Sequence, residues 1–185
     1  PNPDNFEEII FAGLFSKDTS FRIYQKEGVR YPYIAEKDGV PFVVESAETA
    51  SEAVNFTPGL EGYYKVTLNV KNLTISYEAL ETPDVFTSMA MPGSWQANAW
   101  TPSEDLMTAE TTATGLENHD WSATVTFATD SEFKFCANGA WGNDWGSLSF
   151  PIGFANVGDN IKATAGTYKV IFNDILKVFY CQEVE

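Results

Sequence analysis

The residues best suited to chemistry in this sequence are its five tryptophans, all of which lie in the second half. Trp95 and Trp100 stand in the segment 92–102, and Trp141 and Trp145 stand in the segment 138–146. Both segments are rich in Gly, Pro and Asn, which predicts loops. An indole ring on a loop presents a large flat apolar face at small entropy cost, and such a face fits the C–H side of a pyranose ring. The pattern therefore indicates recognition by stacking on a sugar.

The surroundings of these tryptophans leave two interpretations open. Lys, Asn and Asp residues beside the indoles supply donors and acceptors for sugar hydroxyls. Alternatively, the tryptophans fill the ends of a sandwich and bind nothing. Three bulky loop aromatics, Trp100, Trp141 and Trp145, rarely all fit inside a domain this small, so we expect at least one to be exposed. Trp121 opens the alternating run 121–127, and we expect it in the core.

No catalytic motif is visible. A glycosidase needs two carboxylates facing each other across a cleft, and none of the 26 acidic residues is framed by a motif. His119 lies in a polar segment without a Ser, Cys or metal-ligand partner at useful spacing. The glycines of residues 139–146 do not lead from a strand into a helix, so they predict no phosphate-binding loop. The sequence indicates a protein that is not an enzyme and needs neither cofactor nor metal.

Charge and hydropathy exclude two further classes of partner. The 185 residues carry a formal net charge of -15, and the sequence pI is about 4.3. Such a field repels nucleic acid and anionic lipid surfaces. No stretch approaches the roughly 20 apolar residues of a transmembrane span. The opening Pro1–Asp4 resembles a linker, so we expect a chain whose targeting segment has been removed.

Short alternating runs separated by Gly, Pro, Asn and Asp predict strands throughout. Phe133 and Phe135 fall on one face of such a run, and Lys134 and Cys136 fall on the other. Residues 167–173 alternate in the same way. No amphipathic helix of ordinary length is visible, so the sequence predicts an all-β sandwich.

An internal repeat organises the chain. Residues 62–77 read like residues 166–180, each a hairpin with aromatic and Asn residues at the same places. Upstream, residues 20–24 match residues 132–136. Two homologous domains are therefore expected rather than one large domain.

The expected domain boundary lies near Pro83, which cannot donate to a strand ladder. We predict two tandem immunoglobulin-like or carbohydrate-binding-module-like β-sandwich domains, residues 1–82 and residues 83–185. Nothing before Phe6 corresponds to the segment 89–106, so the first domain is expected to be incomplete at its start.

The two cysteines, Cys136 and Cys181, lie in strand-like segments. They could form a disulfide if those strands are neighbours, or they could be two buried free thiols. The sequence leaves both alternatives open.

The second domain combines several motifs that resemble a known family. They are Pro92-Gly93-Ser94-Trp95, Trp100-Thr101-Pro102, Phe133-Lys134-Phe135, the Trp141–Gly146 loop and the Gly166–Asn173 strand. Together they resemble the starch-binding repeats of SusE/SusF-type outer-membrane lipoproteins and, more distantly, the accessory modules of bacterial pullulanases. The resemblance implies a surface-exposed, lipid-anchored outer-membrane protein that holds α-glucan near a glycan importer complex.

The resemblance also assigns site residues. Trp100 and Trp141 would form an aromatic platform, with Trp145 flanking it. Lys134 and Asn173 would supply hydrogen bonds, and the alternation places the Lys134 side chain away from the phenylalanine face. Lys134 could instead be an ordinary solvated strand lysine. Asn173 precedes an Asp at a turn, so it could be a plain turn-former.

The first domain departs from this pattern. It keeps Arg22 and Asn69 at matching positions and has Tyr31 and Tyr33, but it has no tryptophan. A spacer role is expected for it, with a weaker second site as the alternative. For the whole chain we expect a non-catalytic, cell-surface glycan-binding protein used in polysaccharide utilization, with starch or another α-glucan as ligand. The alternative is a structural or adhesin-like β-sandwich spacer without a sugar site.

Overall fold

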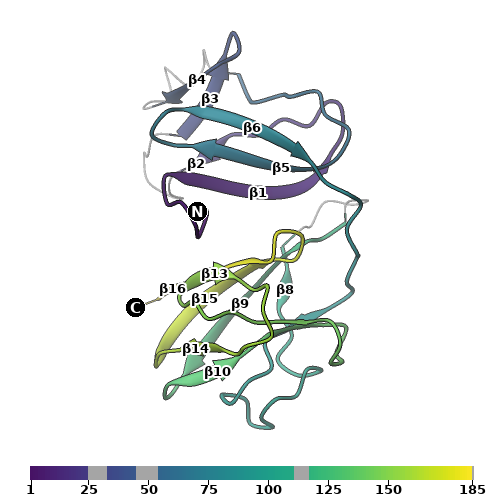
Figure 1. Cartoon of the computed structure of the whole chain (residues 1–185), viewed down its shortest axis with the longest axis vertical. Coiled ribbons are helices and arrows are strands. Elements are labelled where there is room, and N and C mark those ends of the chain that lie inside the picture. Colours follow the sequence, from purple (N-terminus) through teal and green to yellow (C-terminus); the bar gives the residue numbers. More distant parts are fainter. Residues whose placement is uncertain (25–32, 45–53, 111–116, 185) are drawn as a thin grey trace. The chain divides into compact units, whose positions relative to one another are not determined.

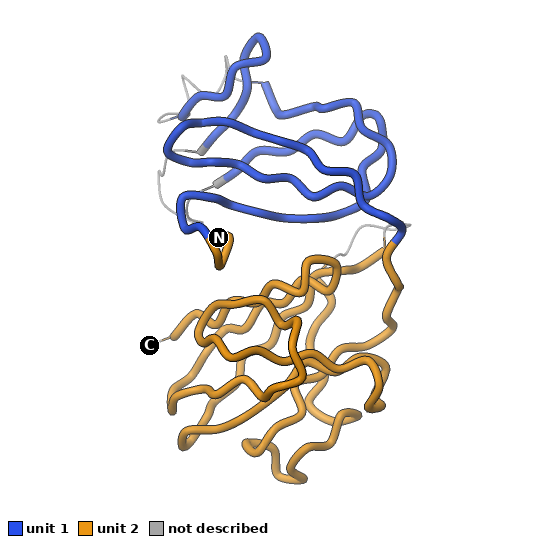
Figure 2. The backbone as a smooth tube through the Cα atoms, viewed as in Figure 1, with its two compact units in different colours: residues 1, 5–82 blue, residues 2–4, 83–185 orange. Residues whose placement is uncertain are grey.

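The computed structural model describes residues 1–24, 33–44, 54–110 and 117–184. The chain divides into two compact units at Thr82 and Pro83 (Figure 2). Unit 1 contains Pro1 and residues 5–82, and unit 2 contains residues 2–4 and 83–185. In the described segments no helix is long and apolar enough to cross a membrane.

In the residues described, unit 1 has two antiparallel sheets of three strands each (Figure 1). The first has the order β1-β5-β6, with bounds Glu8–Phe15, Gly62–Asn69 and Thr74–Ala79. The second has the order β2-β3-β4, with bounds Ile23–Tyr24, Tyr33–Lys37 and Val40–Val44. Ile23, Ile34 and Leu68 from the two sheets, together with Phe56 from outside them, form the main buried core cluster of this unit.

Unit 2 is built on a larger antiparallel sheet (Figure 1). Its strand order is β13-β16-β15-β9-β8, with bounds Ile152–Phe154, Val178–Glu183, Gly166–Asn173, Asp120–Phe127 and Thr108–Ala109. Two smaller sheets lie against it. One has the order β12-β11-β7, with bounds Asp144–Trp145, Phe135–Ala137 and Met89–Ala90. The other pairs β10 (Ser131–Phe133) with β14 (Ile161–Ala163).

The core of unit 2 lies between these layers. The rings of Phe135 on β11 and Phe172 on β15 stack with centroids 4.0 Å apart and an interplanar angle of 4°. Phe133 on β10 stacks in the same way on Phe127 of β9, at 5.7 Å. Truncating one of these rings to alanine would cost roughly 3–5 kcal/mol, as is usual for buried phenylalanines. The described chain is thus all-β and layered as a sandwich, which confirms the predicted fold class.

The alternation expected from the sequence is present on β15. Tyr168, Val170 and Phe172 are buried, whereas Lys169 and Ile171 between them are exposed. This is the pattern of a strand with one face on the core and one face in solvent.

The two repeated hairpins have the same geometry. In unit 1, β5 ends at Asn69 and pairs through Asn69↔Thr74 with β6, and in unit 2, β15 ends at Asn173 and pairs through Asn173↔Val178 with β16. The residue before each return strand, Leu73 or Lys177, has a positive φ, 52° and 55° respectively. The same turn therefore closes both hairpins.

Both cysteines are buried free thiols, which decides between the two alternatives left open by the sequence. Burial raises the pKa of Cys136 to about 11, with a further contribution from the Asp144 carboxylate. Burial alone raises the pKa of Cys181 to about 12. Because the thiolate is the reactive form, both side chains behave as small apolar core groups.

Candidate functional site

The loop that carries Trp100 is organised around the buried side chain of Gln96, which is 6% exposed. Its Oε1 accepts hydrogen bonds from the backbone N–H groups of Gly93 at 3.1 Å and Thr101 at 3.0 Å. Its Nε2 donates to the carbonyl of Thr101 and to a carboxylate oxygen of Asp105, both at 3.1 Å. The amide thus makes four hydrogen bonds, so residues 93–105 are held in one conformation.

Trp100 has a backbone conformation that is rare for a bulky residue. Its φ is 63°, and its N–H donates to the carbonyl of Gly93 at 3.0 Å. The left-handed region costs a residue with a Cβ roughly 1–2 kcal/mol relative to the right-handed one, a cost that glycine avoids. Sparsely populated backbone conformations cluster at functional sites. A tryptophan at a position that favours glycine is therefore a candidate for function.

The loop that carries Trp141 joins β11 to β12 and is also fastened at its base. Ala137 N–H donates to the carbonyl of Asn143 at 2.9 Å, and the Cys136 thiol donates to the carbonyl of Ala140 at 3.2 Å. The backbone turns through positive φ values at Asn138, Gly139 and Gly142. These contacts hold the loop while its tip projects from the sheet.

The two loops bring Trp100 and Trp141 together. Their ring centroids are 6.4 Å apart, and the rings are tilted by 41°. Trp141 is 49% exposed and Trp100 is half-buried. The two loops also approach each other at Gly139 and Ser103. A Cβ atom added to Gly139 would lie 3.5 Å from the Cβ of Ser103. The result is a pair of neighbouring indoles, one exposed and one half-buried.

Lys134, between β10 and β11, lies at the base of the Trp141 loop. Its Nζ donates to Oδ1 of Asp144 at 2.8 Å, and the other carboxylate oxygen accepts from Gly142 N–H at 3.4 Å. The hydrogen bond from Lys134 is the main cause that holds the pKa of Asp144 below its ordinary value. The lysine is therefore not an unpartnered strand lysine, because it anchors the loop and retains two N–H groups for other acceptors.

Asn173 is 6% exposed and belongs to the turn between β15 and β16. Its Oδ1 accepts from Leu176 N–H at 2.8 Å, and its Nδ2 donates to an Asp120 carboxylate oxygen at 2.8 Å. Among the described residues none of its contacts is with Trp100 or Trp141. This geometry favours the turn-former over the sugar ligand, since a short polar side chain that caps the turn has both its ends engaged.

Trp145 is not brought into the tryptophan pair. On β12 its ring packs against Phe86 at 5.3 Å and Phe172 at 6.1 Å. The ammonium of Lys177 lies 3.7 Å from its ring centroid, a cation–π contact that covers the indole. A pocket of about 300 Å³ lies beside it, lined in part by Asp84 and Lys177. Pairing with β11 turns this ring inward, whereas Trp141 four residues earlier lies in the projecting part of the loop.

The remaining two tryptophans serve the core. Trp95 donates from Nε1 to the carbonyl of Met91 at 2.9 Å and meets Phe127 edge-on at 6.1 Å. Trp121 is 3% exposed, which confirms its expected place in the core. Its Nε1 donates to Asp174 at 2.7 Å, and the other oxygen of that carboxylate lies 2.7 Å from Nδ1 of His119. The histidine is thus part of a buried polar network where β9 begins and β15 ends.

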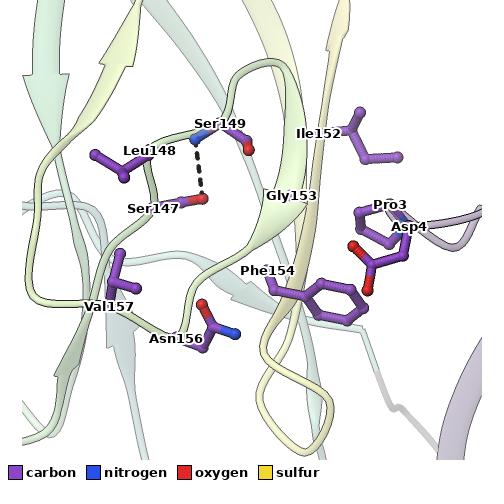
Figure 3. A pocket seen from close by; sticks show the side chains of 10 residues that line it. All are labelled: Pro3, Asp4, Ser147, Leu148, Ser149, Ile152, Gly153, Phe154, Asn156 and Val157. Carbon is purple, nitrogen blue, oxygen red and sulfur yellow. Dashed lines mark hydrogen bonds between the residues drawn. The ribbon is translucent and has the colours of Figure 1, made fainter.

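A pocket away from the tryptophan pair is shown in Figure 3. It has a volume of about 290 Å³ and lies between the turn that contains Leu148, which is 81% exposed, and strand β13 with Phe154. Within it Ser149 N–H donates to Oγ of Ser147 at 3.1 Å. The ring of Phe154 lines it, as does Asp4. With a single aromatic ring it offers no counterpart to the paired indoles.

Two residues of the candidate site were not identified from the sequence. Gln96 gives no motif signal, although its position between Gly93 and Thr101 in a Pro/Gly segment could have suggested a loop brace. Asp144 was visible only as a polar neighbour of the tryptophans. No group of three or more potential metal ligands forms a site in the part of the chain that the structure describes.

No known family profile matches the chain, and no curated protein matches it. The chain is similar to the crystal structure of SusF from Bacteroides thetaiotaomicron. The two share 15% sequence identity with a TM-score of 0.42, and the alignment covers 100% of this chain and 44% of that chain. The chain thus spans less than half the length of that protein.

Proposed function

We propose that the chain is a non-catalytic glycan-binding protein that holds a sugar chain on the Trp100–Trp141 face of unit 2. The observation that carries this proposal is the strained, half-buried Trp100 held 6.4 Å from the exposed Trp141. The buried Gln96 and the Lys134–Asp144 pair fix the two loops beforehand, so little order has to be created on binding.

The α-glucan ligand and the surface location belong to the same proposal. They are supported by the motifs of residues 92–102, 133–146 and 166–173, which resemble SusE/SusF-type starch-binding lipoproteins. By this resemblance the protein is anchored by lipid at the outer membrane and holds polysaccharide for an importer complex. The net charge of -15 is compatible with a neutral ligand and unfavourable for a polyanion.

The site should bind weakly. Each aromatic contact contributes about 0.5–1.5 kcal/mol beyond the area it buries, and each net hydrogen bond contributes about as much. A pair of indoles with a few hydrogen bonds corresponds to dissociation constants from about micromolar to millimolar. Multiple attachment along one polymer would raise the overall affinity.

The decisive experiment is affinity gel electrophoresis in soluble starch with two variants and one control. Trp141→Ala removes the exposed indole, and Trp100→Gly removes the other while relieving the left-handed strain. We expect each variant to lose about tenfold or more in affinity, as central aromatic contacts do. The control is Tyr180→Ala, an exposed aromatic residue on β16, which should retain wild-type retardation.

Trp100→Gly also separates binding from folding. The strain that glycine relieves is of the same order as the stabilisation that the indole ring provides, so the unfolding midpoint of this variant in urea should remain near that of the wild type.

Retardation of Trp141→Ala equal to that of the wild type would contradict the platform. Absence of retardation for the wild type in starch and other polysaccharides would leave the structural spacer as the better function. Incubation with starch should release no reducing ends.

A further inference from the structure

A pocket of about 420 Å³ opens beside Trp100, and Trp141 is not among the residues that line it. Trp100 is common to the pocket and to the tryptophan pair, whereas no residue of the Trp141 loop lines the pocket. The polar residues that line it are Ser94, Asp130, Ser131, Glu132, Lys162 and Thr164. The pocket therefore continues the indole surface toward a group of hydrogen-bonding side chains.

The walls of the pocket come from rigid elements. Glu132 on β10 and Lys162 on β14 are directly opposite each other in the antiparallel ladder, so their side chains share one face. Ser94 is fastened to the same edge, since its N–H donates to the carbonyl of Glu132 at 2.9 Å and its Oγ accepts from Glu132 N–H at 3.0 Å. A ligand would thus meet a formed surface.

Several of these groups retain hydrogen-bonding capacity. Oε2 of Glu132 accepts from Nδ2 of Asn160 at 3.0 Å, and within the described residues Oε1 accepts no hydrogen bond. The Lys162 ammonium has no ion-pair or hydrogen-bond partner in that same part of the chain, even though Glu132 is its cross-strand neighbour. The Ser94 hydroxyl accepts from Glu132 N–H and keeps its own hydrogen to donate.

From this arrangement we propose that the pocket is a second sugar subsite, which extends the tryptophan platform and selects neutral hexose chains. The inference rests on the proposed glycan-binding function. The hexose that follows the one stacked on Trp100 places its vicinal hydroxyls between Glu132 and Lys162. The Glu132 carboxylate accepts a hydrogen bond, and the Lys162 ammonium donates one. Hydroxyl groups satisfy both at once, because each is donor and acceptor.

The charges of the pocket define the ligand class. Two carboxylates, Asp130 and Glu132, face one ammonium, Lys162, so the pocket carries a net negative charge within an acidic protein. A uronate or sulfated sugar would bring its own negative charge against these carboxylates. A chain of neutral hexoses avoids that repulsion, and it is the class that fits.

The test compares ligands of two lengths by isothermal titration calorimetry on the full chain. Maltotriose serves as the short probe for the platform, and maltoheptaose serves as the long probe for platform and pocket together. Lys162→Ala and Glu132→Gln alter the pocket, and Gln at position 132 keeps the acceptor for Asn160. Lys169→Ala, an exposed lysine on β15, is the matched control.

We expect Lys162→Ala and Glu132→Gln each to weaken maltoheptaose binding about threefold to tenfold, the equivalent of one hydrogen bond, with maltotriose binding unchanged. Trp141→Ala should weaken both ligands, and Lys169→Ala neither. The subsite is overturned if the pocket variants bind maltoheptaose within twofold of wild type, or weaken both ligands equally, while Trp141→Ala weakens both. If Trp141→Ala changes nothing, or if wild type binds neither ligand, the proposed function itself fails and the subsite with it.

Discussion

Strands β1, β5 and β6 of unit 1 and strands β9, β15 and β16 of unit 2 pair in the same register. Glu8 lies opposite Asn69 in one unit, and Asp120 lies opposite Asn173 in the other. The opposite ends match as well, with Phe15 against Gly62 and Phe127 against Gly166. The turn asparagines act alike, since Oδ1 of Asn69 accepts from Asn72 N–H at 2.9 Å just as Asn173 accepts from Leu176.

Each unit thus has its own copy of this three-stranded arrangement, and the two units differ in the loops attached to it. Unit 2 carries the segment 92–106 and the loop 138–143, which together hold Trp100 and Trp141, whereas unit 1 has no tryptophan. Arg22, the unit 1 counterpart of Lys134, donates through Nε to Oδ1 of Asn55. Tyr31, an aromatic candidate of unit 1 in the sequence, lies outside the described residues. The comparison indicates that the hairpin is scaffold and that the candidate site is built from loops added to it.

Among the substitutions that test this difference between the units, Gln96→Ala is expected to have the largest effect on stability and starch affinity. The substitution leaves backbone groups of Gly93 and Thr101 without their partner, so unit 2 should lose about 2–4 kcal/mol of unfolding free energy. Starch affinity should fall with it, because the Trp100 loop is released. Urea unfolding followed by tryptophan fluorescence reports unit 2 alone, since all five tryptophans lie there. Asn98→Ala, which removes only exposed contacts to Glu104, is the control and should change little.

The paired substitutions Asn69→Ala and Asn173→Ala test whether the turn asparagine is scaffold in both units. Each removes turn hydrogen bonds, and we expect a loss of about 1–2 kcal/mol in the unit that carries it. Asn173→Ala should shift the tryptophan-fluorescence transition in urea, and Asn69→Ala should shift only the far-ultraviolet circular dichroism transition. Starch affinity of Asn173→Ala at low urea should equal that of the wild type. A large loss of affinity in a folded Asn173→Ala protein would instead support a role for Asn173 in the proposed sugar site.

A smaller effect is expected from acid on the Lys134–Asp144 pair, which anchors only the Trp141 loop. The pKa of Asp144 is lowered in the folded state, so its stabilisation is complete above its ordinary value of 3.8 and is lost as the pH falls through the folded-state value. Because the pair is partly exposed, Asp144→Asn should cost at most about 1 kcal/mol at pH 7. The difference in urea midpoint between wild type and variant should shrink below pH 4. A difference that is constant with pH would exclude this ion pair as the cause.

The smallest effect concerns the thiols, which occur only in unit 2. With pKa values of about 11 for Cys136 and about 12 for Cys181, both remain protonated and buried at pH 8. A chromogenic disulfide reagent should therefore label neither residue in the folded protein and both in urea. Reductant should leave the melting temperature unchanged. Rapid labelling of Cys136 in the native state would show that the Trp141 loop, whose Ala140 carbonyl accepts from this thiol, opens readily.

Much of the fold could be predicted from local sequence. The alternation of residues 167–173 identified β15 and its buried face, because a strand on a core needs apolar groups at every second position. The repeated hairpins were visible for the same reason. The candidate tryptophan site was predictable in part: the Pro/Gly/Asn loops predicted an exposed tryptophan, Trp141 is exposed, and Trp100 lies beside it. The sequence did not show whether Trp145 and Asn173 face solvent or the interior, since a loop tryptophan and a turn asparagine give the same local pattern in both cases.

By itself, the sequence determined the all-β character, the repeat and the acidic, tryptophan-rich second half, because these depend on composition and on periodicity along the chain. Only the tertiary structure decided which indoles form a pair, that Lys177 covers Trp145, and that Glu132 and Lys162 line a pocket beside Trp100. Such facts depend on register and loop path, which bring together residues distant in sequence. No local sequence pattern predicts these contacts, because they form only when the two layers of the sandwich pack around a common core.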